Sequence, residues 1–254
     1  MENSDQISHV ICFRDWMDLQ ERDLSELLHS LTLTNGNVDD DDDNVVLRDL
    51  INKTINHFED YVHRRAGDAP ADVSPYFCSA WCSSLEGSML WAGGCRPSMF
   101  IRLIYALFST GDVLQFCLAD AGDQNAIGDD ELLSADQLVL INSLQLTTIQ
   151  EEDRISRELA SLQEEVADQP IVFIARDLLR HRDAGDEADA ALEVIDVALT
   201  KILLQADNLR LNTLKELLGM LTPIQGVRFL AMAKKLHLCF HQWGQRKDHL
   251  HGRN

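Results

Sequence analysis

Two histidines near the end of the sequence, His237 and His241, are the polar pair best placed to do chemistry. They are four residues apart, which is about one turn of a helix. At about 100° per residue, His237 lies among the apolar residues Phe229, Leu230 and Phe240, and His241 lies at the margin of that stripe. From the residues alone, the favoured interpretation is a core histidine whose ring is satisfied by hydrogen bonds.

Cys78 and Cys82 are the second candidate, since they are four residues apart and could be combined with His57 or His63 as zinc ligands. Structural zinc sites usually take two such pairs, and no second cysteine pair is present. No cysteine stands beside residues that would activate it as a nucleophile. No carboxylate pair, phosphate-binding loop or nucleophile motif in the sequence rises above chance, which predicts a protein that is not an enzyme.

The charge of the chain restricts its partners. Lys and Arg number 22 against 42 Asp and Glu, giving a formal net charge of −20 in 254 residues. Phosphate backbones and anionic membranes are bound mainly by clustered Lys and Arg, so we expect no direct nucleic-acid or membrane partner. No signal peptide or membrane span is evident, and we expect reduced cysteines in the nucleus and cytoplasm.

The elements that must position these residues are long helices, because glycine and proline cluster in a few places. Ser134 and Gln137 form a capping-box pattern before one helix, and Thr222, Pro223 and Gln225 before another that should end at Gly244. Further helices are expected over 45–65 and 188–218. The predicted fold is all-α, a single domain of long antiparallel helices over residues 9–246, with flexible termini at 1–8 and 247–254.

Three connecting segments break the helical pattern. Residues 35–44 contain five consecutive aspartates but lack the alternating ligand spacing of a calcium loop, so we expect a solvated acidic loop. Residues 119–130 are a Gly/Asp-rich connector. In 91–98, Gly93-Gly94 permits a tight turn and Pro97 can start the next helix. Arg96 should tie this turn to a carboxylate or to helix-end carbonyls, although an anion or partner clamp is the alternative.

The N-terminal stretch carries an apolar face that includes Phe13, Trp16 and Met17, with acidic residues such as Asp15 between them. A short amphipathic helix of this kind suits insertion into a partner's groove. Packing into the protein's own core is the equally weighted alternative.

Several segments, in this order along nearly the whole chain, resemble the Delay of Germination family of plants, whose domain also forms the C-terminal part of TGA transcription factors. The matching segments are Phe13–Met17, Trp81 with Ser84–Glu86, Leu90–Ser98 leading into Phe100–Leu103, Asp136–Leu138, Ser161–Glu164, Ala206–Arg210, and Leu221–Gly226 with Lys235–Leu238. Since no basic region or leucine heptad precedes the domain, the chain resembles the dormancy branch.

The resemblance implies a regulator of seed dormancy and germination in abscisic-acid signalling, which binds and inhibits type-2C protein phosphatases through Phe13, Asp15 and Trp16. It also implies haem binding by His237 and His241, although two histidines on one side of a helix cannot easily take both axial positions of one iron. Arg14 and Cys12 depart from the family pattern, so partner choice can differ.

Alternatives are a sensor of haem or a fatty-acyl chain, or a transcriptional coregulator that resembles the TGA domain. Self-association is a further partner expectation.

Overall fold

Helices make up the regular structure of this chain, as the computed structural model shows for residues 2–33, 41–108, 132–168, 171–178 and 185–253. Within these ranges the only β-type pairing is an isolated bridge between Trp91 and Gly94. The predicted all-α class is confirmed. None of the helices in these ranges has an apolar stretch that could cross a lipid bilayer.

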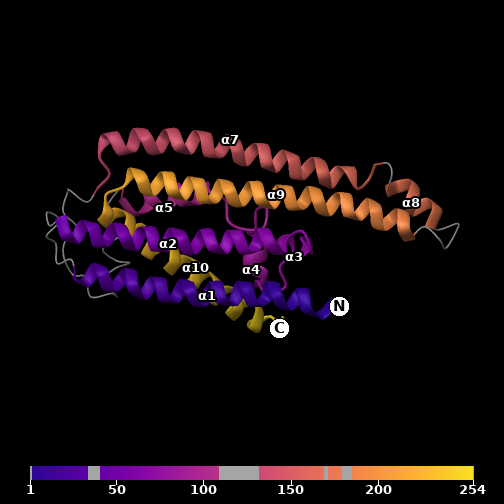
Figure 1. The fold of residues 1–254 in the computed structure, drawn as a ribbon, viewed down its shortest axis with the longest axis horizontal. Helices are drawn as coiled ribbons and strands as arrows, with labels where there is room; N and C mark the ends of the chain where they lie inside the picture. The colour runs from indigo at the N-terminus through magenta and orange to yellow at the C-terminus, as the bar shows by residue number, and fades with distance from the viewer. Residues whose placement is uncertain (1, 34–40, 109–131, 169–170, 179–184, 254) are drawn as a thin grey trace.

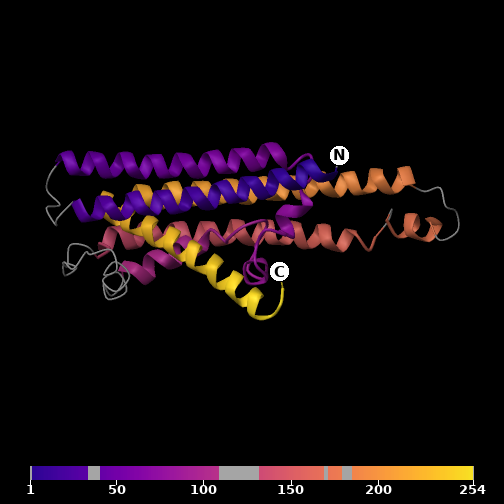
Figure 2. The same cartoon turned by 90° about the horizontal axis from the view of Figure 1, so that it is seen from below.

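Four long helices run side by side, a fifth crosses them obliquely, and together they form most of the molecule (Figure 1). They are α1 (Glu2–Leu33), α2 (Asp41–Asp68), α7 (Ala135–Glu165), α9 (Gly185–Met220) and α10 (Pro223–Leu250). The pairs α1–α2 and α7–α9 are antiparallel, and α2 also packs on α9. Helix α10 crosses the bundle obliquely and contacts α1, α2 and α5 (Figure 2).

Four shorter helices fill the remaining positions. They are α3 (Ser74–Phe77), α4 (Ser84–Gly87), α5 (Ser98–Phe108) and α8 (Ile171–Leu178). Helix α4 packs against α10, and α8 packs against the first half of α9. The short helices α3 and α4 therefore bring the segment 74–90 close to both α9 and α10.

Both predicted capping boxes are present. The Ser134 side chain accepts from the Gln137 backbone N–H at the start of α7, and the Thr222 side chain accepts from that of Gln225 at the start of α10. The amide of Gln137 also donates to Oε1 of Gln225 over 2.8 Å. Since this bond joins the starts of α7 and α10, the caps fix helix placement as well as helix ends.

The main core lies where α10 meets the other helices. Apolar side chains that are at most 2% exposed include Leu27 of α1, four from α5, Ile141 of α7, Leu217 of α9 and Phe229 of α10; the α5 residues are Ile101, Ile104, Leu107 and Phe108. Burial of this kind contributes roughly 1.5–3 kcal/mol per large side chain, and thereby holds α10 in place.

The predicted end of the last helix at Gly244 is wrong, since α10 continues to Leu250. Gly244 is buried instead of acting as a cap, and a Cβ there would lie 1.9 Å from Ser83 Oγ. The glycine is needed because α10 and the start of α4 approach each other at this point.

Other helix bounds also exceed the predicted ones. Helix α1 already begins at Glu2, inside the expected flexible segment 1–8, and α10 extends into 247–254. Helix α2 begins at Asp41, so 41–44 of the expected acidic loop are helical, because carboxylates are favoured at a helix N-terminus. Residues 34–40 and the predicted connector over 119–130 lie outside the described residues.

Candidate functional site

The N-terminal candidate residues lie on α1, where they divide between the interior and the surface. Phe13 and Trp16 are half-buried, whereas Asp15 is exposed. The Asp15 carboxylate accepts from Nη1 of Arg64 on α2 over 3.0 Å, and the side chains are 51% and 45% exposed. The surface along the α1–α2 seam therefore presents a charged pair, with the aromatic rings turned toward the bundle.

Trp16 is held by three neighbours. Its ring stacks on Tyr61 of α2 with centroids 4.4 Å apart and planes 10° apart, and it also contacts Phe58. The Nζ atom of Lys234 lies 5.5 Å from its ring centroid. These contacts favour the core-packing interpretation of Trp16.

Lys234 brings a buried charge to this site. Its Nζ donates to Asp23 over 2.8 Å and to Gln20 over 3.2 Å, and the same Asp23 carboxylate is 2.9 Å from Nδ1 of His57. Burial lowers the pKa of Lys234, while the Asp23 carboxylate opposes this change. The Lys234–Asp23 ion pair links α10 to α1 close to Trp16. His57 contacts Asp23 at this site and is not placed with the cysteines.

Phe13 connects the two candidate regions. Its ring meets the His241 ring edge-on with centroids 5.7 Å apart, and it lies 6.4 Å from the Trp81 ring. The N-terminal partner residues and the C-terminal histidines, which are more than 200 positions apart in sequence, therefore share one side of the bundle.

His241 is fixed by hydrogen bonds on both ring nitrogens. Nδ1 is 2.8 and 3.0 Å from the two carboxylate oxygens of Glu86, and Nε2 is 2.8 Å from Nε2 of Gln245. Glu86 also closes the capping box of α4 by accepting from Ser83. Burial by itself raises the pKa of Glu86, but the bonds from His241 and Ser83 outweigh it and lower this pKa. We call Ser83, Glu86 and His241 the α4 clasp.

His237 lies one turn before the clasp and is half-buried. Burial lowers its pKa to about 4, with Glu86 opposing and His241 and Lys234 reinforcing the change. The ring is consequently neutral at pH 7, the form in which a histidine nitrogen can ligate a metal. His237 thus fits the chemistry of a haem ligand, whereas both nitrogens of His241 are already in use.

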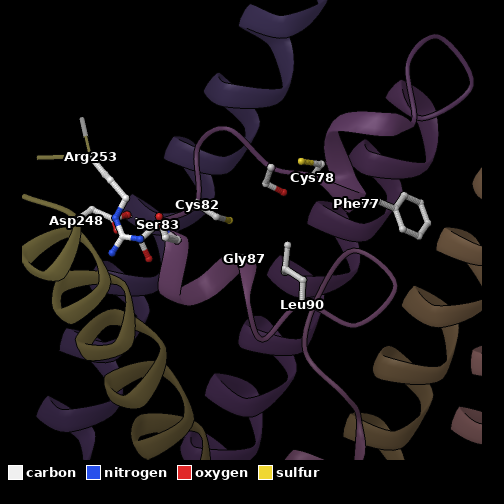
Figure 3. Close-up of a pocket in the computed structure, with 10 residues that line it drawn as sticks. Phe77, Cys78, Cys82, Ser83, Gly87, Leu90, Asp248 and Arg253 are labelled. Carbon is white, nitrogen blue, oxygen red and sulfur yellow. Dashed lines mark hydrogen bonds and ion pairs between the residues drawn. The ribbon is translucent and has the colours of Figure 1, made fainter. Parts of the chain in front are cut away.

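An open pocket of about 600 Å³ lies next to the α4 clasp (Figure 3). Its lining is mixed: Phe77 and Leu90 supply apolar surface, and Ser83 and the ion pair of Asp248 with Arg253 supply polar surface. Neither His237 nor His241 lines it. Asp248 also accepts from the Ser84 backbone N–H over 2.7 Å, which ties the end of α10 to α4.

Cys78 and Cys82 both line this pocket. Burial and the nearby Glu86 raise the pKa of Cys82 to about 12. Its thiol therefore stays protonated at neutral pH, which does not favour it as a nucleophile. Within the described ranges, no three His, Cys, Asp or Glu side chains gather in a way that could hold a metal ion.

The predicted tight turn at Gly93-Gly94 is present and is held by buried arginines. Ala92 and Gly93 have φ of +43° and +75°, and Trp91 and Gly94 exchange backbone hydrogen bonds of 2.7 and 3.1 Å. Arg210 donates to the carbonyls of Trp91, Ala92 and Cys95, while Arg65 donates to that of Gly93.

Asp207 of α9 forms ion pairs with both arginines that hold the turn. Its carboxylate lies 2.6 Å from Nη1 of Arg210 and 3.4 Å from Nε of Arg65. Arg96 has the expected structural role, with Nη1 3.5 Å from Glu152. Glu152 in addition accepts from the Ser98 backbone N–H over 2.7 Å and so caps α5.

Sequence reasoning gave no role to four buried charged residues: Glu86, Asp207 and Arg210, which were named only within family-matching segments, and Lys234. Two local signals were available. Ser83 and Glu86 have capping-box spacing, and Asp207 and Arg210 are three apart on a helix. The contacts of Glu86 with His241, and of Arg210 with the 91–95 turn, join residues far apart in the sequence, so no local spacing indicates them.

The architecture is that of a helical-bundle protein in which side chains of α1 and α10 meet at one surface. A family model for DOG1, described as seed dormancy control, matches residues 23–106. The Arabidopsis thaliana protein DOG1-like 3 is 34% identical over 93% of this chain and 84% of its own length. DOG1-like 2 from the same plant is 35% identical over 92% and 89%.

The chain therefore belongs to the DOG1 family of seed dormancy control, as the sequence motifs indicated. The Arabidopsis transcription factor TGA1 is also similar, with 26% identity over 85% of this chain and 49% of its own length. Membership supports the regulatory class expected from the sequence.

Proposed function

We propose that this chain regulates seed dormancy and germination in abscisic-acid signalling by binding and inhibiting a type-2C protein phosphatase at the α1–α2 seam. The observation that supports the site is the exposed Asp15–Arg64 pair, which joins α1 to α2 as the Trp16–Tyr61 stack does. Family membership supports the regulatory role.

In this proposal the aromatic residues position the contact. Phe13 and Trp16 are committed to contacts inside the bundle, so they hold α1 and orient Asp15 toward the partner. A phosphatase would compete with Arg64 for the Asp15 carboxylate. Such exposed charges mainly govern association rate and specificity, because water and salt screen them.

Replacing Asp15 with lysine should weaken phosphatase binding by about tenfold or more, because it reverses a charge at the contact. Asp49→Lys is the matched control, since Asp49 is exposed on α2 and the charge change is identical. The measurement is affinity for a recombinant type-2C phosphatase and inhibition of its activity on a phosphopeptide. Equal phosphatase affinities of the two variants would show that the phosphatase does not bind at the α1–α2 seam. If the unmodified chain did not inhibit the phosphatase, the proposed function itself would be refuted.

Haem binding is a second proposal, favoured by the neutral His237 ring. Haem would supply an iron that binds small ligands or transfers electrons. His237 would ligate it, and His241 would stay within the α4 clasp as the hydrogen-bond partner of Glu86.

His237→Ala should abolish the Soret shift of purified protein mixed with haem. His241→Ala should leave a shift, because that ring is engaged elsewhere, and His249→Ala serves as an exposed control on the same helix. A shift that survives His237→Ala would contradict this assignment.

A third proposal, a nuclear and cytoplasmic coregulator, is supported by the similarity to the transcription factor TGA1. This role would act through protein contacts, including self-association, because the net charge of −20 disfavours direct DNA binding. The test is whether this chain co-purifies with the DNA site of a TGA factor when that factor is present. The chain should no longer co-purify with the DNA when the factor is omitted.

A further inference from the structure

One end of the bundle projects beyond the other helices. The projecting part consists of the first half of α9, the last turns of α7, and the whole of α8. In both views it extends past the neighbouring ends of α1 and α2 (Figures 1 and 2). We call residues 185–197 of α9 the α9 tip. This end of the molecule contributes no residue to the phosphatase contact, the α4 clasp or the pocket described above.

The α9 tip carries an uncovered apolar stripe. Val194 and Val197 are 69% and 66% exposed, and Ala190 precedes Val194 by one turn on the same side. The opposite side of α9 is occupied, because Leu199 packs on the cluster that contains Ile155 and Leu162. Spacings of three and four residues are those with which helices contact other helices.

Carboxylates surround this stripe. Asp186, Glu187, Asp189, Glu193 and Asp196 lie between Gly185 and Thr200, where no Lys or Arg occurs. None of the five forms an ion pair with another residue in the described part of the chain. Over 158–197 the sequence has eleven acidic against three basic residues, so the surrounding field is negative as well.

We propose that the α9 tip docks a Lys- and Arg-rich amphipathic helix of a partner protein. The apolar side of that helix would cover Ala190, Val194 and Val197, and its cations would pair with the flanking carboxylates such as Glu193. Charge complementarity selects this occupant, because nucleic acids and anionic membranes are repelled by the same field. The inference goes beyond the proposed phosphatase contact and is independent of it.

The test uses the full chain and a fluorescein-labelled synthetic 18-residue helix with Leu at positions i, i+3, i+4 and i+7 and Lys elsewhere. A scrambled peptide of the same composition carries equal charge without an apolar face. Fluorescence anisotropy should show about tenfold tighter binding of the amphipathic peptide, because only it covers the valines.

Variants locate the contact. Val194→Ser with Val197→Ser should weaken binding about fivefold or more, and Glu193→Lys with Asp196→Lys about tenfold or more. The matched controls are Val139→Ser with Leu146→Ser, which alter exposed apolar residues of α7, and Asp49→Lys with Glu216→Lys, which make the same charge change elsewhere. These should stay within about twofold of the unmodified chain. Tip variants that match their controls, or equal binding of the two peptides, would overturn the proposal.

Discussion

Replacing Arg210 with alanine should lower the free energy of unfolding by about 3–5 kcal/mol, the usual cost of breaking a buried ion pair. Arg210 and Asp207 are 3% and 1% exposed at the side chain, with Nη1 and Oδ1 2.6 Å apart. The variant would leave three backbone carbonyls of the 91–95 turn without this donor, together with a less well paired Asp207 carboxylate. The turn that leads into α5 would lose its main attachment to α9.

Urea unfolding followed by circular dichroism measures this effect. Arg154→Ala is the control, because Arg154 is 43% exposed and its ion pairs with Glu151 and Glu158 are worth at most about 1 kcal/mol. Arg210→Lys keeps the charge but not the planar guanidinium group. Its loss of unfolding free energy should therefore lie between those of Arg210→Ala and Arg154→Ala. A loss for Arg210→Ala no greater than that for Arg154→Ala would contradict the role of this residue.

Acidification should destabilise the protein through His237 by about 3 kcal/mol between pH 7 and pH 4. The folded-state pKa of about 4 lies below the ordinary value of 6.5, so the unfolded chain binds more protons in this range. Stability is therefore lost as the pH falls through 6.5 toward 4. Each unit of pKa difference corresponds to about 1.4 kcal/mol.

The effect is isolated by comparing the chain with His237→Phe at pH 7 and pH 4. Since all other titrating groups are common to both proteins, the change in their stability difference between the two pH values reports His237 alone. His237→Gln checks that the result does not depend on the packing of the new side chain. A stability difference that is the same at both pH values would contradict a His237 ring that is neutral in the folded protein.

The helical class followed from the sequence because its causes are local. Ser134 with Gln137, and Thr222 with Pro223 and Gln225, satisfy the first backbone N–H groups of their own helices. The same holds for the turn at Gly93, where a positive φ is required by the local chain path. Family membership was also predictable, since motifs spread along the chain are a property of sequence.

Local rules failed where a residue serves a distant partner. Gly244 resembles a helix end, but it is required by the approach of Ser83, 161 positions earlier in the sequence. Residues 41–44, three aspartates and an asparagine, also resemble a loop, yet they begin α2 for a local reason, since acidic side chains are favourable at a helix N-terminus.

The sequence by itself determined the helical class, the caps of α7 and α10, the acidic character and the family of this protein. Only the tertiary structure decided that Phe13 contacts His241, that Glu86 contacts the His241 Nδ1, and that Asp15 is exposed while Trp16 stacks on Tyr61. The physical reason is that capping and periodicity act over three or four residues. Contacts between α1, α4 and α10 depend instead on how whole helices pack, which no short spacing encodes.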